Sequence, residues 1–197
     1  MEKDFETLIT GFIETKIGIS DHFLSERLAT HLKENLLSLY DQNLLVPAGT
    51  GNAEKLSFNA HVRSDVIYWL DRKHNNTFEN EFFDLVEDFI RYLNKSCFAG
   101  ITGYEFHYSL YEAGSFYARH RDQFKNHSGR KYSMISYLNS EWQKGQGGEL
   151  LICQALGDQR IAPTQGKTVF FKSNELIHEV LPTTRMRLSL TGWLKGI

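Results

Sequence analysis

The stretch FYARHRDQF (116–124) places His120 and Asp122 two residues apart, and His178 follows far downstream in ELIHEVLP (175–182). In an extended strand alternate side chains lie on one face of the sheet, so an imidazole and a carboxylate at this spacing point to one spot. A further strand could bring His178 to the same place. Two histidines and one carboxylate on one side of a metal leave open coordination positions, which suits non-haem Fe(II).

An arginine in the last strand-like segment supports iron over zinc. Arg187 lies nine residues after His178, at the start of RLSLTGWL (187–194). A guanidinium binds a carboxylate through two parallel hydrogen bonds, and the distal carboxylate of 2-oxoglutarate is such a group. A His/His/Asp site could also hold catalytic zinc, but a zinc hydrolase would have little use for this arginine.

Five segments extend the pattern beyond these residues: VRSDVIYWLD (62–71), FHYSLYEAGSFYARHRD (106–122), YSMISYLNSEW (132–142), GGELLI (147–152) and HEVLPTTRMRLSLTGWL (178–194). Together they resemble the Fe(II)/2-oxoglutarate-dependent dioxygenases of the prolyl 4-hydroxylase family. The resemblance is strongest to the branch that holds the hypoxia-inducible-factor prolyl hydroxylases and their bacterial relatives. It covers most of the chain and implies a double-stranded β-helix, or jelly roll, with the metal in its open mouth.

The resemblance also implies roles for individual residues. The metal ligands would be His120, Asp122 and His178. Residues of the cosubstrate site would bind the distal carboxylate of 2-oxoglutarate or line its pocket, and they are Arg187, Tyr137, Tyr111, Thr191, Leu150 and Val180. Strand tyrosines are ordinarily packing residues, and Leu150 and Val180 could equally be plain core.

The parity of the last strand distinguishes two arginines. Arg187, Ser189, Thr191 and Trp193 follow one another at two-residue intervals and should share one face. Arg185 has the same parity and is the rival for the carboxylate. Its place nearer the PTT turn favours a surface charge.

The other histidines lack such a context. His107 lies on a strand close to the expected site and could line it, although a packing role is favoured. The remaining five are interpreted as solvent-exposed or packing residues: His22, His31, His61, His74 and His127.

Substrate binding is expected near Arg63 and Asp65. They match an RxD element that, in the hypoxia-type enzymes, lies beside the peptide-binding groove and follows a mobile loop. The alternative is a surface ion pair on an edge strand. The corresponding loop, 45–61, is rich in glycine and small polar residues and has no steady period, so we expect a lid.

The hydrophobic pattern predicts a mainly β fold with supporting α-helices in a single domain, 1–197. Residues 1–100 should be mostly helical support plus the lid loop, and 101–197 should form the jelly-roll core. One helix should begin after the N-cap Ser25, with a stripe of leucines, and another should cover Glu79 to Asn94. Strands are expected in YEFHYSLYE, KYSMISYLN, ELLICQ, TVFFK and RLSLTGWL.

Composition limits the setting and the partners. The net charge of −2 gives no electrostatic help for nucleic-acid binding, and no run approaches the length of a membrane span. Cys97 and Cys153 are far apart and form no CxxC motif. With no secretion signal at the N-terminus, we expect a cytoplasmic protein.

The expected reaction is hydroxylation coupled to decarboxylation of 2-oxoglutarate, which gives succinate and CO₂. By resemblance, the substrate is a prolyl residue in an intracellular protein, with elongation factor Tu as a candidate, and ascorbate could serve as reductant. Other possibilities are the same chemistry on a free amino acid, another small molecule or a nucleobase. A non-catalytic jelly-roll binding module is a further alternative.

Overall fold

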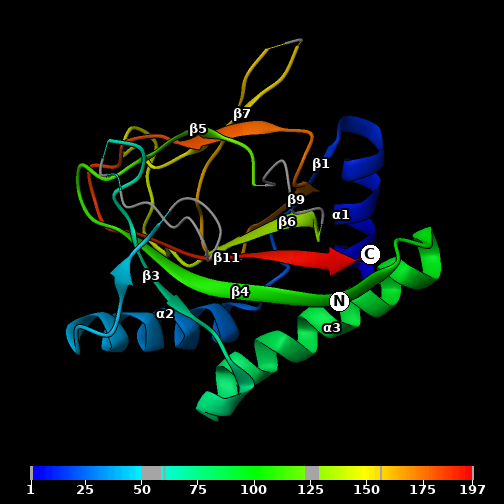
Figure 1. Cartoon of the computed structure of the whole chain (residues 1–197), viewed down its shortest axis with the longest axis horizontal. Coiled ribbons are helices and arrows are strands. Elements are labelled where there is room, and N and C mark those ends of the chain that lie inside the picture. Colours follow the sequence, from blue (N-terminus) through cyan, green and yellow to red (C-terminus); the bar gives the residue numbers. More distant parts are fainter. Residues whose placement is uncertain (1, 50–58, 60, 123–128, 156, 197) are drawn as a thin grey trace.

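The computed structural model describes residues 2–49, 59, 61–122, 129–155 and 157–196. Two antiparallel sheets face each other, and three α-helices lie on the outer side of the larger sheet (Figure 1). The expectation of a mainly β, double-stranded β-helix fold is confirmed. Among the described helices, none has the length and apolar character that crossing a bilayer requires.

The helices begin at side chains that cap their first amides. Helix α2 (Glu26–Asp41) starts after Ser25, whose hydroxyl accepts from the Leu28 amide at 3.2 Å, as expected. Helix α3 (Thr77–Cys97) starts after Asn76, which accepts from two amides. Helix α1 (Glu2–Thr15) and a short 3₁₀ turn, Arg72–His74, complete the set.

The larger sheet has the order β1-β9-β6-β11-β4-β3-β2, and the smaller one has the order β5-β10-β7-β8. The strands of the larger sheet are β1 (Ile17–Ser20), β2 (Val46–Pro47), β3 (Val66–Trp69), β4 (Ile101–Tyr111), β6 (Arg130–Tyr137), β9 (Thr168–Lys172) and β11 (Arg187–Gly196). Those of the smaller sheet are β5 (Tyr117–His120), β7 (Leu150–Cys153), β8 (Gln159–Ile161) and β10 (Ile177–Val180).

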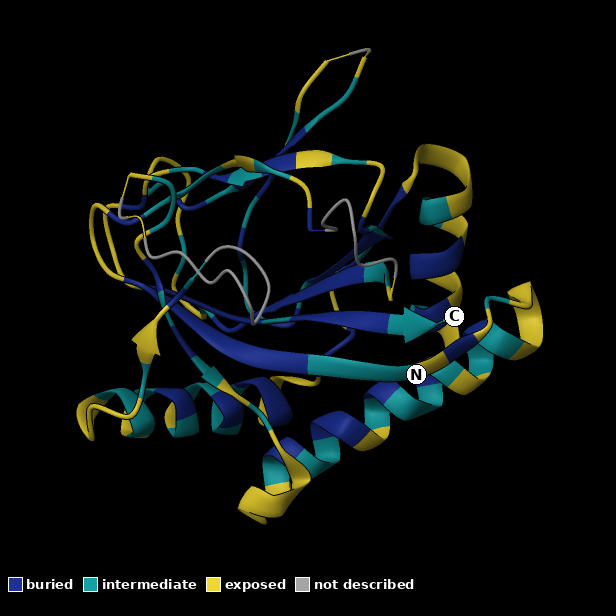
Figure 2. Cartoon of the chain, viewed as in Figure 1, coloured by how far each residue is buried: buried dark blue, intermediate teal, exposed yellow. Residues whose placement is uncertain are grey.

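Two hydrophobic clusters lie on opposite faces of the larger sheet. One fills the space between this sheet and the helices, where Phe82 and Phe89 of α3 meet the buried face of the strands. The other lies between the two sheets and includes Ile135, Leu150 and Val180. Figure 2 shows the helices buried on the side that faces the sheet and exposed on the other. The second cluster leaves room for a cavity, where the site is built.

The helices and strands of the first half differ in part from the sequence-based expectations. Helix α1 was not expected, although Phe5, Leu8 and Ile9 recur at helical spacing and are buried. Three strands, β1 to β3, join the region expected to be mostly helical. The expected lid, 45–61, falls mainly on 50–58 and 60, which lie outside the described residues. Its first part forms strand β2, in which Val46 and Pro47 pair with Ile67 and Val66 of β3.

Candidate metal and cosubstrate site

Three side chains from two strands and one loop meet at one point. His120 ends β5 and lies directly opposite His178 of β10 in the register of the smaller sheet. Asp122 follows two residues after His120. The ligand atoms of the three all lie within 4.8 Å of one another. The structure therefore brings together the three residues that the sequence singles out.

Backbone carbonyls orient both imidazoles. His120 Nδ1–H donates to the Ala118 carbonyl at 2.7 Å, and His178 Nδ1–H donates to the Leu176 carbonyl at 3.3 Å. Both Nε2 atoms therefore face inward, 3.4 and 3.6 Å from the Asp122 carboxylate oxygens. A second hydrogen bond on the far nitrogen is the usual way to orient a metal-binding histidine.

The charges of the triad favour a deprotonated carboxylate. Burial alone would raise the pKa of Asp122, but His178 and the hydrogen bonds from both histidines hold it well below its usual range. Burial lowers the pKa of His120. For His178, burial also favours the neutral ring, yet the Asp122 charge raises the pKa. A carboxylate and two imidazoles form the donor set that suits Fe(II).

A serine, Ser133, donates a hydrogen bond to the Asp122 carboxylate, and a second serine, Ser173, contacts Ser133. Ser133 of β6 donates to Asp122 Oδ2 at 2.6 Å, and its oxygen lies 2.9 Å from the Ser173 hydroxyl. All three residues are buried. These contacts restrict the carboxylate to one orientation, as supporting groups do around metal ligands.

Arg187 is a buried cation with one unused end. Its Nε donates to the Gly148 carbonyl at 2.8 Å, and Nη1 donates to the Ser189 hydroxyl at 3.1 Å. The Nη2 atom finds no hydrogen-bond partner among the described residues, and the residue is 2% exposed. A buried charge is costly unless it is paired, so this geometry fits an anionic ligand such as a carboxylate.

Two glycines, Gly147 and Gly148, form the turn that places the Gly148 carbonyl beside Arg187. Gly147 and Gly148 both have positive φ, 73° and 74°. A Cβ on Gly147 would lie 2.0 Å from the Pro182 oxygen, and one on Gly148 would lie 3.1 Å from Arg187 Cδ. Glycine is needed here because the turn and the close approach exclude a side chain.

Two tyrosines flank the guanidinium. Arg187 lies 4.8 Å from the Tyr111 ring centroid and 5.1 Å from that of Tyr137. The Tyr137 hydroxyl is buried and has no partner among the described residues. Burial raises the pKa of Tyr137 to about 12, so the phenol stays protonated and offers a hydrogen bond to the same ligand.

The predicted parity of the last strand is confirmed in position. Arg187, Thr191 and Trp193 of β11 line one cavity, whereas Leu188 and Leu190 pack into the cluster beneath the helices. Arg185 lies outside the strand. Its side chain is 52% exposed, 3.7 Å from the Glu141 carboxylate.

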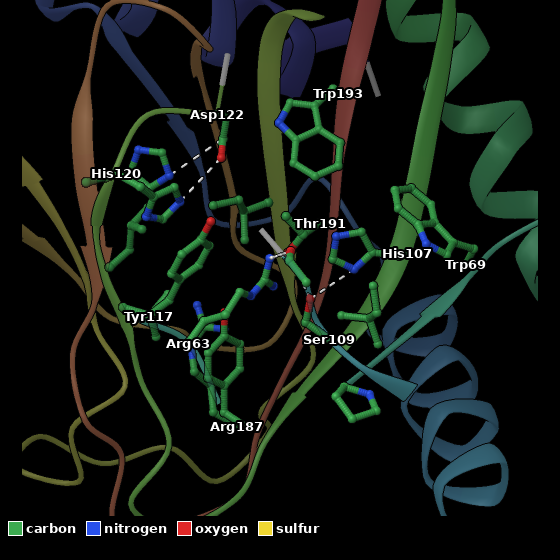
Figure 3. Close-up of a pocket in the computed structure, with 18 of the residues that line it drawn as sticks. Arg63, Trp69, His107, Ser109, Tyr117, His120, Asp122, Arg187, Thr191 and Trp193 are labelled. Atoms are coloured by element: carbon green, nitrogen blue, oxygen red, sulfur yellow. Dashed lines mark hydrogen bonds and ion pairs between the residues drawn. The ribbon is translucent and has the colours of Figure 1, made fainter. Parts of the chain in front are cut away.

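A cavity of about 210 Å³ lies between the two sheets. Its walls include the triad, Arg187, Tyr111, Leu150 and Val180, as the sequence predicts. Figure 3 shows His120 and Asp122 at one side of this space, with Arg187 and Thr191 near the middle and His107 and Trp69 at the far side.

Arg63 and Asp65 form a buried ion pair rather than the surface pair considered as the alternative. Arg63 Nε and Nη2 donate to the two Asp65 oxygens at 2.8 and 2.6 Å. The side chains are 11% and 0% exposed. The Arg63 guanidinium also lies 4.2 Å from the Tyr117 ring centroid, on the cavity wall.

Several cavity residues were not predicted from the sequence. Tyr117 stacks on His120 with ring centroids 3.5 Å apart. His107, for which packing was favoured, does line the cavity, between Trp69 and Trp193. Strand parity could have indicated Ser109, because it shares a face of β4 with His107 and Tyr111.

Residues 106–195 match the family described as the 2OG-Fe(II) oxygenase superfamily. This segment runs from β4 to β11 and contains the whole triad and Arg187. Among curated proteins, human Egl nine homolog 1 is 25% identical in an alignment of 188 residues that covers 90% of this chain. The chain spans 43% of the length of that relative.

Two solved structures are similar over nearly the whole chain. A Pseudomonas putida prolyl-4-hydroxylase is 30% identical with a TM-score of 0.87, covering 98% of this chain and 99% of that one. A Trichoplax adhaerens prolyl hydroxylase, solved with a peptide fragment of the hypoxia-inducible factor oxygen degradation domain, has a TM-score of 0.86 at 22% identity, covering 98% and 91%. The second likeness shows a shared fold.

Proposed function

The chain belongs to the 2OG-Fe(II) oxygenase superfamily, on its prolyl hydroxylase branch, and from this premise we propose that it hydroxylates a prolyl residue in a protein. One observation carries the proposal: the triad and Arg187, whose Nη2 has no partner among the described residues, line the same cavity. The reaction needs a metal with open positions and a cation for the cosubstrate in one place.

The residues would divide the two ligands between them. His120, Asp122 and His178 would hold Fe(II). Arg187 and Tyr137 would bind the distal carboxylate of 2-oxoglutarate, because each has a buried hydrogen-bond donor with no partner among the described residues. Fe(II) and 2-oxoglutarate, when both are bound, would supply the activation of dioxygen. One oxygen atom is inserted into a substrate C–H bond, and the other is taken up as 2-oxoglutarate becomes succinate and CO₂.

The rest of the cavity would control water and orientation. Thr191 would donate a third hydrogen bond to the distal carboxylate, and Tyr111 would close its side. Leu150 and Val180 offer only apolar atoms, so they would keep water from the reacting carbon. The buried Arg63–Asp65 pair would hold a fixed wall of the substrate groove beside Tyr117.

The nature of the substrate is the finer part of the proposal. The 30% identity with the Pseudomonas putida prolyl-4-hydroxylase supports a prolyl side chain as the target. Resemblance to the bacterial branch makes elongation factor Tu our candidate protein. The free thiols of Cys97 and Cys153 are consistent with a reducing cytoplasm, where ascorbate could keep the iron ferrous.

A spectroscopic experiment tests the cosubstrate assignment. Purified protein mixed with Fe(II) and 2-oxoglutarate without oxygen should develop a weak visible charge-transfer band. Arg187→Ala should require far more 2-oxoglutarate for the same band. A wild-type protein that shows no band would contradict the assignment and favour a binding module or a zinc site.

A proteomic experiment tests the substrate. Proteins from the native host, with and without the enzyme, are compared by mass spectrometry for the gain of one oxygen on proline. We expect at least one proline, with elongation factor Tu examined first. Cosubstrate turnover without any modified proline would point to a small-molecule substrate instead.

A further inference from the structure

A chain of polar side chains runs from Arg187 to His107 through β11 and β4. Arg187 Nη1 donates to Ser189 Oγ at 3.1 Å, and the Ser189 and Thr191 hydroxyl oxygens are 3.5 Å apart. Ser109 Oγ donates to Thr191 Oγ1 at 3.5 Å and lies 3.1 Å from His107 Nδ1. Thr191 therefore has a polar neighbour on each side.

Strand register brings these residues together. Ser109 lies directly opposite Ser189, and His107 lies directly opposite Thr191, in the antiparallel pairing of β4 with β11. All of them have the parity that faces the space between the sheets. Figure 3 shows Thr191 between Arg187 and His107, with Ser109 hydrogen-bonded to the imidazole.

The residues at the two ends of this series of hydrogen-bonded side chains, Arg187 and His107, determine which groups in it donate. Arg187 can only donate a hydrogen bond. At the other end, His107 Nδ1 lies 3.0 Å from the Tyr108 carbonyl, which can only accept, so Nδ1 carries a proton. Burial lowers the pKa of His107 to about 4, which keeps the ring neutral. The same Nδ1–H is shared with Ser109.

The hydrogen bonds that start at Arg187 and at His107 then meet at Thr191. Ser189 accepts from Arg187, so its own proton is available to Thr191. Ser109 accepts from His107, so its proton also goes to Thr191. With the serine hydroxyls donating to its oxygen, Thr191 is free to donate its own proton to a third partner, and its side chain lines the cavity.

We propose that His107 and Ser109 are positioning residues, which act through Thr191 and direct its hydroxyl proton toward the distal carboxylate of 2-oxoglutarate. This inference rests on the proposed cosubstrate site at Arg187. Without the hydrogen bond from Ser109, the Thr191 hydroxyl could donate its proton to Ser189 instead. It would then present a lone pair, rather than a proton, to the distal carboxylate of 2-oxoglutarate. Binding of a dicarboxylate would weaken, while the metal site would be unchanged.

The experiment compares two oxo acids on the Fe(II)-loaded protein without oxygen, using the charge-transfer band to measure affinity. 2-Oxoglutarate has the distal carboxylate, and 2-oxopentanoate has a methyl group in its place. Ser109→Ala and His107→Leu should each weaken 2-oxoglutarate about fivefold, the effect of one neutral hydrogen bond. Neither should change the affinity for 2-oxopentanoate.

Two further variants separate positioning from packing. His107→Asn should recover most of the affinity that His107→Leu loses, because an asparagine amide N–H can take the place of the Nδ1–H. Thr191→Val should weaken 2-oxoglutarate as Ser109→Ala does, and the double variant should lose nothing more.

Three outcomes would overturn the inference. Wild-type affinity for 2-oxoglutarate in Ser109→Ala would show that Ser109 does not orient Thr191. Equal weakening of both oxo acids would show a merely structural role. A wild-type protein that binds neither oxo acid would refute the cosubstrate site itself, and the inference with it, which distinguishes that failure from the first two.

Discussion

The two faces of strand β11 have opposite chemistry, although they alternate along one segment of ten residues. Leu188, Leu190 and Leu194 face the helices and belong to a closely packed apolar cluster. Arg187 and Thr191 face the cavity, beside buried polar atoms that lack partners among the described residues. One face supports the fold, and the other keeps its hydrogen-bonding capacity for a ligand.

The difference has an energetic meaning. A buried polar group without a partner costs roughly 1 to 3 kcal/mol, and Arg187 and Tyr137 each have one such atom within the part of the chain that the structure describes. The helix side can offset that cost because large aromatic residues, including Phe82, Phe89 and Phe170, are fully buried there. Variants on the two faces should therefore affect different measurements.

The largest effect is expected at the metal ligands on the cavity side. His120→Ala, Asp122→Ala and His178→Ala should each abolish iron binding and 2-oxoglutarate turnover, because three donors are needed to hold the metal with open positions. The fold should remain, since these residues lie outside both hydrophobic clusters. Metal analysis and circular dichroism measure the two properties. Normal turnover in any one variant would contradict the triad.

A helix-side substitution should show the reverse behaviour. Phe89→Ala should lower the free energy of unfolding by about 3 to 5 kcal/mol, because it leaves a cavity among Phe5, Phe23 and Phe170. The folded fraction should bind iron and 2-oxoglutarate as the wild type does. Denaturant titration and the charge-transfer band provide the measurements. A large loss of cosubstrate affinity would show that the two faces are coupled.

The two arginines near the start of β11 give a matched pair. Arg187→Ala should weaken 2-oxoglutarate binding by about tenfold to a hundredfold, since a charge-assisted bond is worth roughly 1.5 to 3 kcal/mol. Arg185→Ala should have little effect, because its side chain is exposed and pairs with Glu141. A larger effect at Arg185 would assign the carboxylate to the other arginine.

The smallest effect is expected at Ser133, which supports the metal ligand Asp122. Ser133→Ala removes the hydrogen bond to Asp122 and should weaken iron binding by about tenfold, as is typical for groups that orient a ligand. Ser136→Ala is the control, because Ser136 lies on the same strand with opposite parity and bonds to Thr168. Similar iron affinities in the two variants would rule out a special role for Ser133.

Sequence patterns with short range predicted much of this molecule. The Ser25 cap, the leucine stripe of α2 and strands such as β9 follow from capping and periodicity. Helix α1 was missed because acidic residues interrupt its apolar positions. The buried state of the Arg63–Asp65 pair was also missed, since burial depends on strands and side chains far away in the sequence.

The sequence by itself determined the kinds of donor at the site and their parity. His120, Asp122 and Arg187 were identified because residue chemistry and a two-residue repeat are local properties. Only the tertiary structure decided that His178 lies opposite His120, that Ser133 supports Asp122, and that His107 and Ser109 lie across from the Arg187 face of β11. Such contacts depend on the register between strands, which is set by the packing of the whole sheet rather than by any one segment.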